Sequence, residues 1–183
     1  LSARGASLER DGTMLCSDVD VDFEAGQLVA VVGPNGAGKS SLLALLAGDL
    51  DPATGSVDLD GSAMSSVEPL ELARRRAVLS QSNSVAFPFS VAEVVTMGRF
   101  PWSAQSSAAT DQRIVAESMA ATDVAHLARR RITTLSGGEA ARVALARVLA
   151  QDTPIVLLDE PTASLDIQHP EKVFDPLPAK AQG

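Results

Sequence analysis

The sequence has few of the residues that mark secreted, membrane-spanning or nucleic-acid-binding proteins. Its single cysteine, Cys16, cannot form a disulfide within the chain, which favours a reducing compartment. No apolar run approaches the ~20 residues that cross a bilayer, and no signal peptide is recognisable. Acidic residues outnumber basic ones 23 to 15, and the resulting net charge of −8 argues against a nucleic-acid partner. We expect one globular domain that could work at a membrane only as a peripheral subunit, in a chain whose first residue is Leu rather than Met.

A glycine-rich segment is the most informative feature that the chain does have. It fits the phosphate-loop pattern G-x-x-x-x-G-K-[ST] and reads Gly33, Pro34, Asn35, Gly36, Ala37, Gly38, Lys39, Ser40, Ser41. The apolar run 28–32 before it predicts a buried parallel strand, and the run 41–47 after it predicts a helix. A strand, a glycine loop and a helix in this order predict a phosphate site, whereas a glycine-rich turn without a ligand is the plainer alternative.

The residue types in this loop suit a polyphosphate. Gly36 and Gly38 allow the backbone to curl so that successive N–H groups face one concavity. Lys39 would reach the β- and γ-phosphates, and the hydroxyl of Ser40 could ligate Mg²⁺. The helix that begins near Ser40 adds the positive end of its dipole. Because the whole chain is acidic, these local donors would have to attract the anion.

A second motif is an apolar strand, expected at 155–158, that ends in Asp159 and Glu160. At the carboxyl end of a parallel sheet such groups face the ligand crevice. Asp159 would hold Mg²⁺ through its water shell, and Glu160 would polarise the attacking water. An ordinary strand end is the alternative interpretation.

A third motif opens the helix expected at 138–150. Ser136 and Glu139 have the spacing of a capping box, which by itself explains their residue types. A helix start with Gly137 and Gly138 also presents free N–H groups, so that it forms a second possible anion site. One nucleotide does not need two such sites on one face, which suggests that two copies of the chain enclose each nucleotide.

The coarse pattern elsewhere alternates strands with helices, which predicts an α/β fold with a mainly parallel sheet. The expected strands are a half-exposed one at 18–23 and shorter ones at 56–59 and 77–79. The expected helices are 68–76, 91–97 and, as one or two helices, 110–127.

Together, the phosphate loop, LSGGE at 135–139 and LLDEPTASLD at 157–166 resemble the ATP-binding subunit of ABC transporters. The resemblance implies a phosphate-loop NTPase fold with a mainly parallel central sheet, a small antiparallel N-terminal β part and a helical subdomain at about 82–137. It also implies that Gln81 contacts Mg²⁺ and senses the γ-phosphate, and that Asp166 communicates across a homodimer. Ser136, Gly137 and Gly138 would then touch the γ-phosphate of the nucleotide bound to the partner copy.

The segment 86–102, AFPFSVAEVVTMGRFPW, is similar to the ATPases of importers for haem, iron–siderophore complexes and cobalamin, and most similar to haemin importers. In that family the segment docks integral membrane permease subunits. The resemblance therefore implies a peripheral ATPase at the cytoplasmic face of the cell membrane, with a substrate-binding protein as an indirect partner. Ordinary core packing of Phe87, Phe89 and Trp102 is the alternative. A soluble, non-transport ATPase of the same fold is a second functional alternative.

The chain departs from this family pattern at both ends. Arg10 falls near the position of the adenine-stacking aromatic, and the sequence has no tyrosine. The resemblance covers an incomplete ATPase domain at 1–169, whereas the proline-rich tail at 170–183 looks divergent and unstructured. His126 and His169 do not match the family's switch histidine and are expected at the surface. The strand that the family places between the loop strand and the Asp159 strand is missing, which predicts unpaired strand edges and a chain that is inactive by itself.

Overall fold

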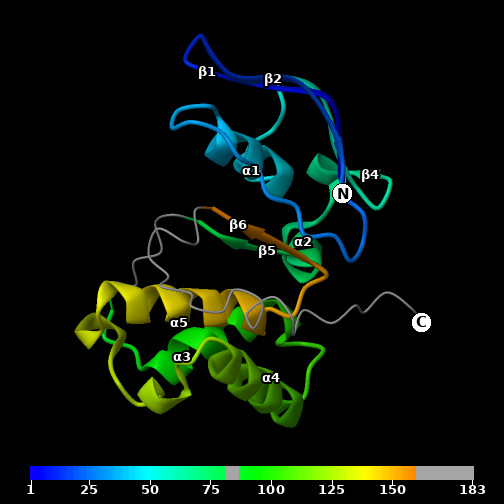
Figure 1. Ribbon diagram of the computed structural model, residues 1–183. Coiled ribbons are helices and arrows are strands. Elements are labelled where there is room, and N and C mark those ends of the chain that lie inside the picture. The colour runs from blue at the N-terminus through cyan, green and yellow to red at the C-terminus, as the bar shows by residue number, and fades with distance from the viewer. Residues whose placement is uncertain (81–86, 160–183) are drawn as a thin grey trace. The chain divides into compact units, whose positions relative to one another are not determined.

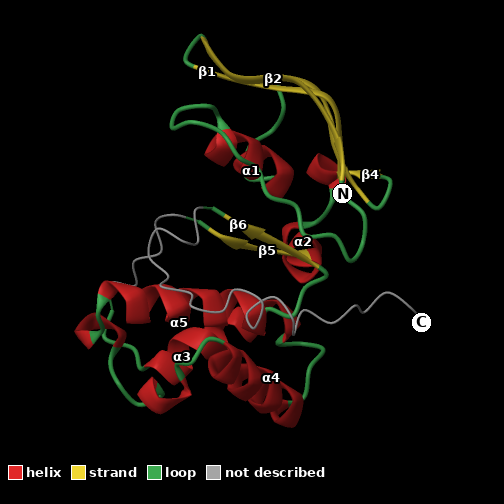
Figure 2. Cartoon of the chain, in the orientation of Figure 1, coloured by secondary structure: helices red, strands yellow, loops and turns green. Residues whose placement is uncertain are grey.

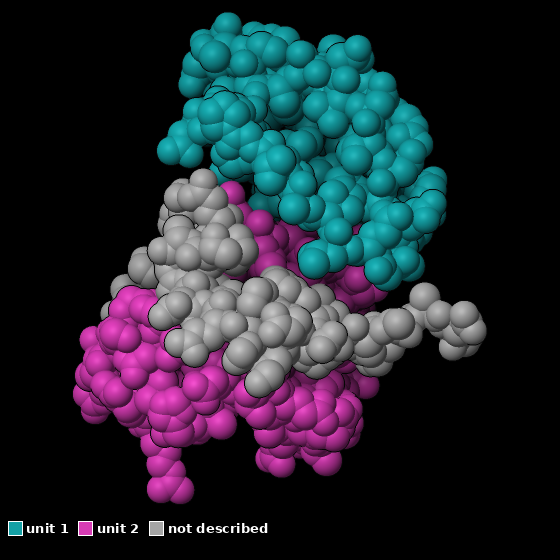
Figure 3. All heavy atoms as spheres, viewed as in Figure 1, with its two compact units in different colours: residues 1–72, 179–183 teal, residues 73–178 magenta. Residues whose placement is uncertain are grey.

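The computed structural model describes residues 1–80 and 87–159. They form two compact units, of which unit 1 contains residues 1–72 and unit 2 contains residues 73–80 and 87–159 (Figures 1 and 3). Each unit buries its own set of apolar side chains.

Unit 1 contains a four-stranded antiparallel sheet with the strand order β2-β1-β3-β4 (Figure 2). The strands are β1 (Ser2–Arg10), β2 (Thr13–Asp22), β3 (Thr54–Leu59) and β4 (Ser62–Ala63). The first two form a hairpin through Asp11 and Gly12, whose φ angles are 51° and 74°. Asp-Gly with positive φ at both positions suits the tight turn that matches strand twist.

The helix α1 (Lys39–Ala47) packs against β1 and β2 in unit 1. Its last three residues are buried, and Gly48 follows them with a φ of 71°. A Cβ atom at Gly48 would lie 2.6 Å from the sulfur of Met64, so the helix end fits closely over the short helix η1 (Met64–Ser66). The helix α2 (Pro69–Arg75) follows in the sequence, and the division into units falls between its residues Leu72 and Ala73.

Unit 2 contains a parallel pair of strands, β5 (Arg76–Leu79) and β6 (Ile155–Leu158), with Leu79 opposite Leu158. The helix α5 (Gly137–Ala150) packs against this pair. The buried residues of this contact are Ala77, Leu79, Ala144, Leu145 and Val148. β6 follows α5 directly in the chain, so this contact fixes the strand that leads to Asp159.

The remaining elements of unit 2 are helical (Figure 2). They are α3 (Val91–Thr96), η2 (Met97–Trp102), α4 (Ala108–Ala121), η3 (Ala125–Leu127) and η4 (Ile132–Thr134). α3, α4 and α5 share one core, built largely from Val91, Val94, Val95, Val115, Met119, Val124, Leu127, Val143, Ala146 and Ala150. In the described part of the chain, no helix combines the length and apolar character that a membrane crossing requires.

Most of the elements expected from the sequence are confirmed. β2 begins five residues earlier than the expected strand at 18–23, and in it half-buried Val19 and Val21 alternate with exposed Asp20 and Asp22. The helices expected at 68–76, 91–97 and 138–150 correspond to α2, α3 and α5, and the region 110–127 corresponds to α4 and η3. The subdomain boundaries at 82 and 137 remain predictions, and the tail at 170–183 lies outside the described residues.

The prediction of a buried strand at 28–32 is wrong. These residues form no strand, and Leu28 and Val32 are 78% and 88% exposed. A strand is stabilised by backbone pairing and burial rather than by its own apolar side chains. Among the described residues, none pairs with this run, and the strands fall into two separate sheets instead of one central sheet.

Candidate nucleotide-binding site

The phosphate-loop segment curls sharply before α1. The N–H of Ala37 donates to the carbonyl oxygen of Pro34 at 3.2 Å, and Gly36 and Gly38 have φ angles of 81° and 85°. Gly38 is the residue that caps α1, and it offers no side-chain acceptor to the first turn. The first amides of a helix have no partner within the helix, so this start leaves backbone donors facing the loop.

Gly38 is fixed by a contact that is distant in sequence. A Cβ atom at this position would lie 2.3 Å from the carbonyl oxygen of Leu15 on β2, which is closer than real Cβ atoms approach. A Cβ atom at Gly36 would meet no atom within 4 Å. Gly38 is therefore required by both its backbone angles and its packing, whereas Gly36 is required by its backbone angles alone.

The ammonium group of Lys39 lies over the loop. Its Nζ donates to the carbonyl oxygens of Gly33 and Pro34, each at 3.0 Å. The first turn of α1 contains no acidic residue. The dipole end of the helix and the lysine therefore give this loop a local positive charge in a protein that is negative as a whole.

The helix α5, which the LSGGE motif opens, begins differently, with a closed capping box. The carboxylate of Glu139 accepts hydrogen bonds from the backbone N–H of Ser136 at 2.7 Å and from its hydroxyl at 2.9 Å. In return, the Ser136 hydroxyl oxygen accepts from the N–H of Glu139. These bonds, together with Arg130 and Arg142, hold the pKa of Glu139 below its ordinary value. The carboxylate is therefore charged at neutral pH and offsets part of the helix dipole.

Gly137 has no packing role in the described part of the chain. A Cβ atom there would meet no atom within 4 Å, and its φ angle is not positive. A glycine that neither backbone angles nor packing requires is typical of a place where another group approaches the backbone closely. The capping box therefore explains Ser136 and Glu139, whereas close approach by another group would explain Gly137.

The other predicted site residues lie on unit 2 or outside the described part of the chain. The N–H of Asp159 donates to the carbonyl oxygen of Leu79 at 2.9 Å, directly after the β5–β6 pair. Gln81 and Glu160 lie outside the described residues, as do Asp166 and His169. The two strands that Gln81 and Glu160 follow in the sequence end side by side, with Leu79 opposite Leu158.

The aromatic residues of the segment 86–102 divide into two groups. Phe87 and Phe89 are exposed, and their ring centroids are 6.1 Å apart. Phe100 is 74% exposed. Trp102 is half-buried, and its indole N–H donates to the carbonyl oxygen of Gln151 at 2.6 Å. Core packing therefore explains Trp102 in part and does not explain Phe87 or Phe89.

Two residues noted at the edges of the family pattern are exposed. Arg10 lies at the end of β1 near Asp11, with its side chain 73% exposed. His126 lies in η3, near Asp123 at 3.9 Å, and its surface location is confirmed.

The contact between Gly38 and Leu15 could not be found from the sequence, because no local pattern marks a backbone carbonyl 23 positions away.

The fold defines a phosphate-loop domain of the ABC type. The family model of the ABC transporter matches residues 16–163, and the chain belongs to this family. It is similar to the hemin import ATP-binding protein of Nocardia farcinica, with 57% identity over 95% of this chain and 62% of the relative. It is also similar to a cobalamin import ATP-binding protein of Halobacterium salinarum, with 46% identity over 92% of this chain and 42% of the relative.

The structure of a dimeric bacterial ABC transporter cassette superimposes with a TM-score of 0.81 at 25% identity, over 95% of this chain and 79% of that chain. The family resemblance and the fold class expected from the sequence are therefore confirmed. The chain spans about 62% of the length of the Nocardia relative.

Proposed function

We propose that this protein is the ATP-binding and ATP-hydrolysing subunit of an ABC importer that carries haemin across the cell membrane. The observation that carries the proposal is the curled loop ahead of α1, where Lys39 lies 3.0 Å from two loop carbonyls. The missing cap and the absence of acidic residues in the first turn suit a polyphosphate better than a neutral ligand.

The loop residues Gly33–Ser41 would bind the triphosphate of ATP through backbone N–H groups and Lys39. Ser40 is an exposed residue at the start of α1 whose hydroxyl oxygen is a suitable Mg²⁺ ligand, and Asp159 and Gln81 are the other proposed ligands. When bound, Mg²⁺ would neutralise charge on the phosphate oxygens. Glu160 would orient the attacking water, so that catalysis depends on placement and electrostatics rather than on a covalent intermediate.

A second copy of the chain would complete the site. Ser136, Gly137 and Gly138 would contact the γ-phosphate bound to the partner copy, and Asp166 would communicate between the copies. The dimeric ABC cassette with the same fold supports this arrangement. The unexplained glycine at position 137 supports it as well, because a side chain there would stand between the helix start and an approaching phosphate.

The transported compound is inferred from the relatives. Haemin is favoured by the Nocardia hemin import protein at 57% identity, and cobalamin is the alternative from the 46% identical Halobacterium protein. Iron–siderophore complexes remain a further alternative. In each case the ATPase would bind integral membrane subunits at the cytoplasmic face of the membrane, with a substrate-binding protein as an indirect partner.

Equilibrium binding of Mg-ATP tests the first part of the proposal. Lys39→Ala removes a charge-assisted contact worth about 1.5–3 kcal/mol, so we expect roughly ten- to hundredfold weaker binding. Arg113→Ala, which removes an exposed arginine on α4, is the matched control and should bind as the unmodified chain does. Equal affinities of the two variants would contradict the proposed phosphate site.

Turnover tests the second part. Glu160→Gln should bind Mg-ATP normally but hydrolyse it hardly at all, because the side chain can no longer polarise water. This assay is run on the chain beside the Nocardia relative with the equivalent substitution. Normal turnover by the substituted relative would remove this glutamate from its proposed role.

Co-purification separates a transport subunit from a soluble ATPase of the same fold. A transport subunit is recovered with an integral membrane protein after mild detergent extraction, and a soluble ATPase is not. Haemin and cobalamin uptake by cells that carry the assembled transporter would then distinguish the two cargoes.

A further inference from the structure

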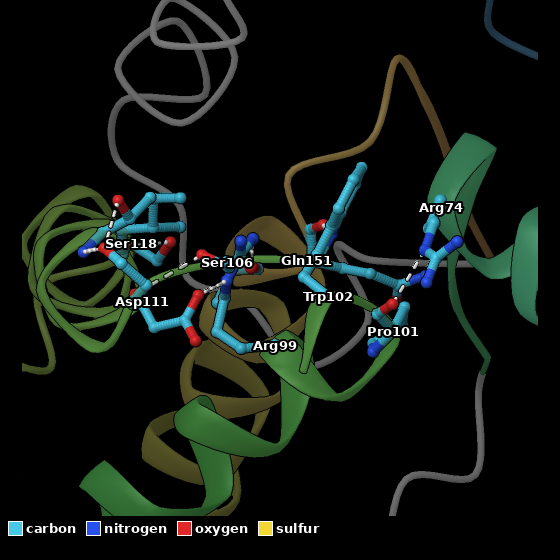
Figure 4. A network of polar contacts seen from close by, with 12 residues as sticks. Arg74, Arg99, Pro101, Trp102, Ser106, Asp111, Ser118 and Gln151 are labelled. Atoms are coloured by element: carbon cyan, nitrogen blue, oxygen red, sulfur yellow. Dashed lines mark hydrogen bonds and ion pairs between the residues drawn. The ribbon is translucent and has the colours of Figure 1, made fainter. Parts of the chain in front are cut away.

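The segment η2 carries a second group of polar contacts that the nucleotide chemistry does not use (Figure 4). We name it the Trp102 cluster, and it consists of Arg74, Arg99, Trp102, Asp111 and Gln151. All five residues belong to unit 2. A Cβ atom at Gly98 would lie 2.2 Å from the carbonyl oxygen of Arg147, so the backbone of η2 lies directly on the last turn of α5.

Two side chains of the cluster bind the C-terminal end of α5. Arg99 Nη1 donates to the carbonyl oxygen of Ala150 at 2.9 Å, and Trp102 Nε1 donates to that of Gln151 at 2.6 Å. The last carbonyls of a helix have no partner within the helix, and the negative end of the dipole favours a cation there. The end of α5 opposite Ser136 is therefore capped by η2.

Gln151 extends the cluster from α5 to β5. Its Nε2 donates to the carbonyl oxygens of Ala73 at 2.6 Å and Arg76 at 2.9 Å, so both amide hydrogens are used. Arg74 in turn donates through Nε to the carbonyl oxygen of Pro101 at 2.8 Å. The residues that enter β5, the end of α5 and η2 are thus joined by directional hydrogen bonds in a closed circuit.

Charge and stacking make this circuit resistant to displacement. Arg99 is only 5% exposed and donates through Nε to Asp111 at 2.8 Å. A hydrogen bond from Ser106, and then the one from Arg99, lower the pKa of Asp111. The guanidinium carbons of Arg74 and Arg99 lie 5.8 Å and 5.6 Å from the Trp102 ring centroid. Moving η2 away from α4 and α5 would leave a buried charge without its partner, which is costly.

The same six residues of η2 also present apolar surface. Met97 and Phe100 are exposed, whereas Gly98, Arg99 and Pro101 between and beside them are buried. One face of the segment is therefore anchored on α5 and linked to β5 through Gln151, and the other face is exposed. A displacement of the exposed face would strain these directional hydrogen bonds, which connect η2 to the end of α5 and, through Gln151, to β5.

We propose that Trp102 and Gln151 are positioning residues that convey the docking of the membrane subunit to the ATPase site. This inference rests on the proposed transport function. A displacement of Met97 and Phe100 when the membrane subunit binds is transmitted through Trp102 to the C-terminal end of α5. The N-terminal end of the same helix carries Ser136 and Gly137. It passes through Gln151 to β5, which Gln81 follows in the sequence.

The test uses the assembled transporter and measures how strongly the membrane subunits stimulate ATP hydrolysis. Trp102→Phe keeps an aromatic ring, although a smaller one, and removes the N–H, and Gln151→Glu keeps the size and removes both donors. We expect Mg-ATP affinity and the basal rate without membrane subunits to stay within about twofold, while stimulation falls about fivefold or more. Gln112→Glu, an exposed position on α4, is the control for the charge change and should keep full stimulation.

The outcomes separate this inference from the proposed function. Unchanged stimulation in Trp102→Phe and Gln151→Glu overturns the positioning role, and so does an equal loss of basal rate and stimulation, which marks a purely structural effect. If Gln151→Glu does not fold, Trp102→Phe decides the question alone. Lys39→Ala in the same complex tests the proposed function, because unchanged ATP binding and hydrolysis in this variant would contradict the proposed phosphate site and not the cluster.

Discussion

The two helices that carry the chemical motifs begin in opposite ways. α1 starts at Gly38 with no side-chain cap and no acidic residue in its first turn, and Lys39 adds a positive charge. α5 starts at Ser136 with a closed capping box, so that the carboxylate of Glu139 lies at the same helical position that Ser41 occupies in α1. The N-terminus of α1 is therefore open to an anion, whereas the carboxylate of Glu139 already occupies the N-terminus of α5.

This difference separates the two tasks that a helix start can perform. The closed start of α5 stabilises the helix by itself, because two backbone donors are satisfied locally. The open start of α1 lacks that stabilisation, and its first backbone N–H groups are available to a ligand. An anion site that binds without help is therefore expected at α1, whereas the start of α5 would contribute only when a partner brings the phosphate to it.

The largest expected effect is that of Gly38→Ala, which adds a Cβ atom at the open N-terminus of α1. The left-handed backbone costs an L-residue about 1–2 kcal/mol and overpacking against Leu15 about 1–3 kcal/mol, so we expect a loss of about 3 kcal/mol. Gly36→Ala has the same backbone strain without the clash and should lose only about 1–2 kcal/mol. Hydrogen exchange of the α1 amides, with α5 as internal reference, measures both. Equal losses would show that the Leu15 contact is unimportant.

The next effect tests whether the missing carboxylate keeps α1 open. Ser41→Glu gives α1 the residue that α5 has at this position, and repulsion between a carboxylate and the phosphates should weaken Mg-ATP binding about tenfold or more. Ser41→Gln matches its size without the charge and should bind much more strongly than Ser41→Glu. Titration with a fluorescent ATP analogue provides the measurement. If both variants bind alike, charge at this position does not distinguish the two helix starts.

A smaller effect is expected when the closed start is opened. Ser136→Ala removes the hydroxyl that accepts from Glu139, and loss of such a cap costs about 1 kcal/mol. Trp102 is the single tryptophan and lies in unit 2, so its fluorescence follows denaturation of the unit that contains α5. Ser90→Ala removes the equivalent cap of α3 and should have a similar cost. No shift in the denaturation midpoint for Ser136→Ala would contradict a stabilising cap.

The smallest effect is a pH dependence of stability to which the closed helix starts contribute and the open start does not. Hydrogen bonds from Ser136 and Ser90 lower the pKa of Glu139 and Glu93 from the ordinary value of 4.5. A lowered pKa in the folded state stabilises above the ordinary value, and this contribution disappears as the pH falls below it. Unit 2 should therefore lose stability between about pH 5 and pH 3. Glu139→Gln should flatten this dependence, and an unchanged slope would exclude Glu139 as its source.

Local signals made the loop and the helix starts predictable. Glycine spacing, capping residues and apolar periodicity act within a few residues of each other, so the sequence predicted α1, α5 and the strand β6. The prediction of a strand at 28–32 was wrong for the opposite reason. Its five apolar residues match a buried strand, but strand formation depends on neighbours that lie elsewhere in the chain.

The chemistry of the phosphate loop and the capping box of α5 follow from the sequence by itself, because each depends on residues that are adjacent or three to four positions apart. Tertiary structure alone decided that Gly38 must pack against Leu15 and that Arg99, Trp102 and Gln151 join η2 to both α5 and β5. These contacts join residues 23 to 78 positions apart, and no local pattern specifies which distant backbone carbonyl a side chain will meet.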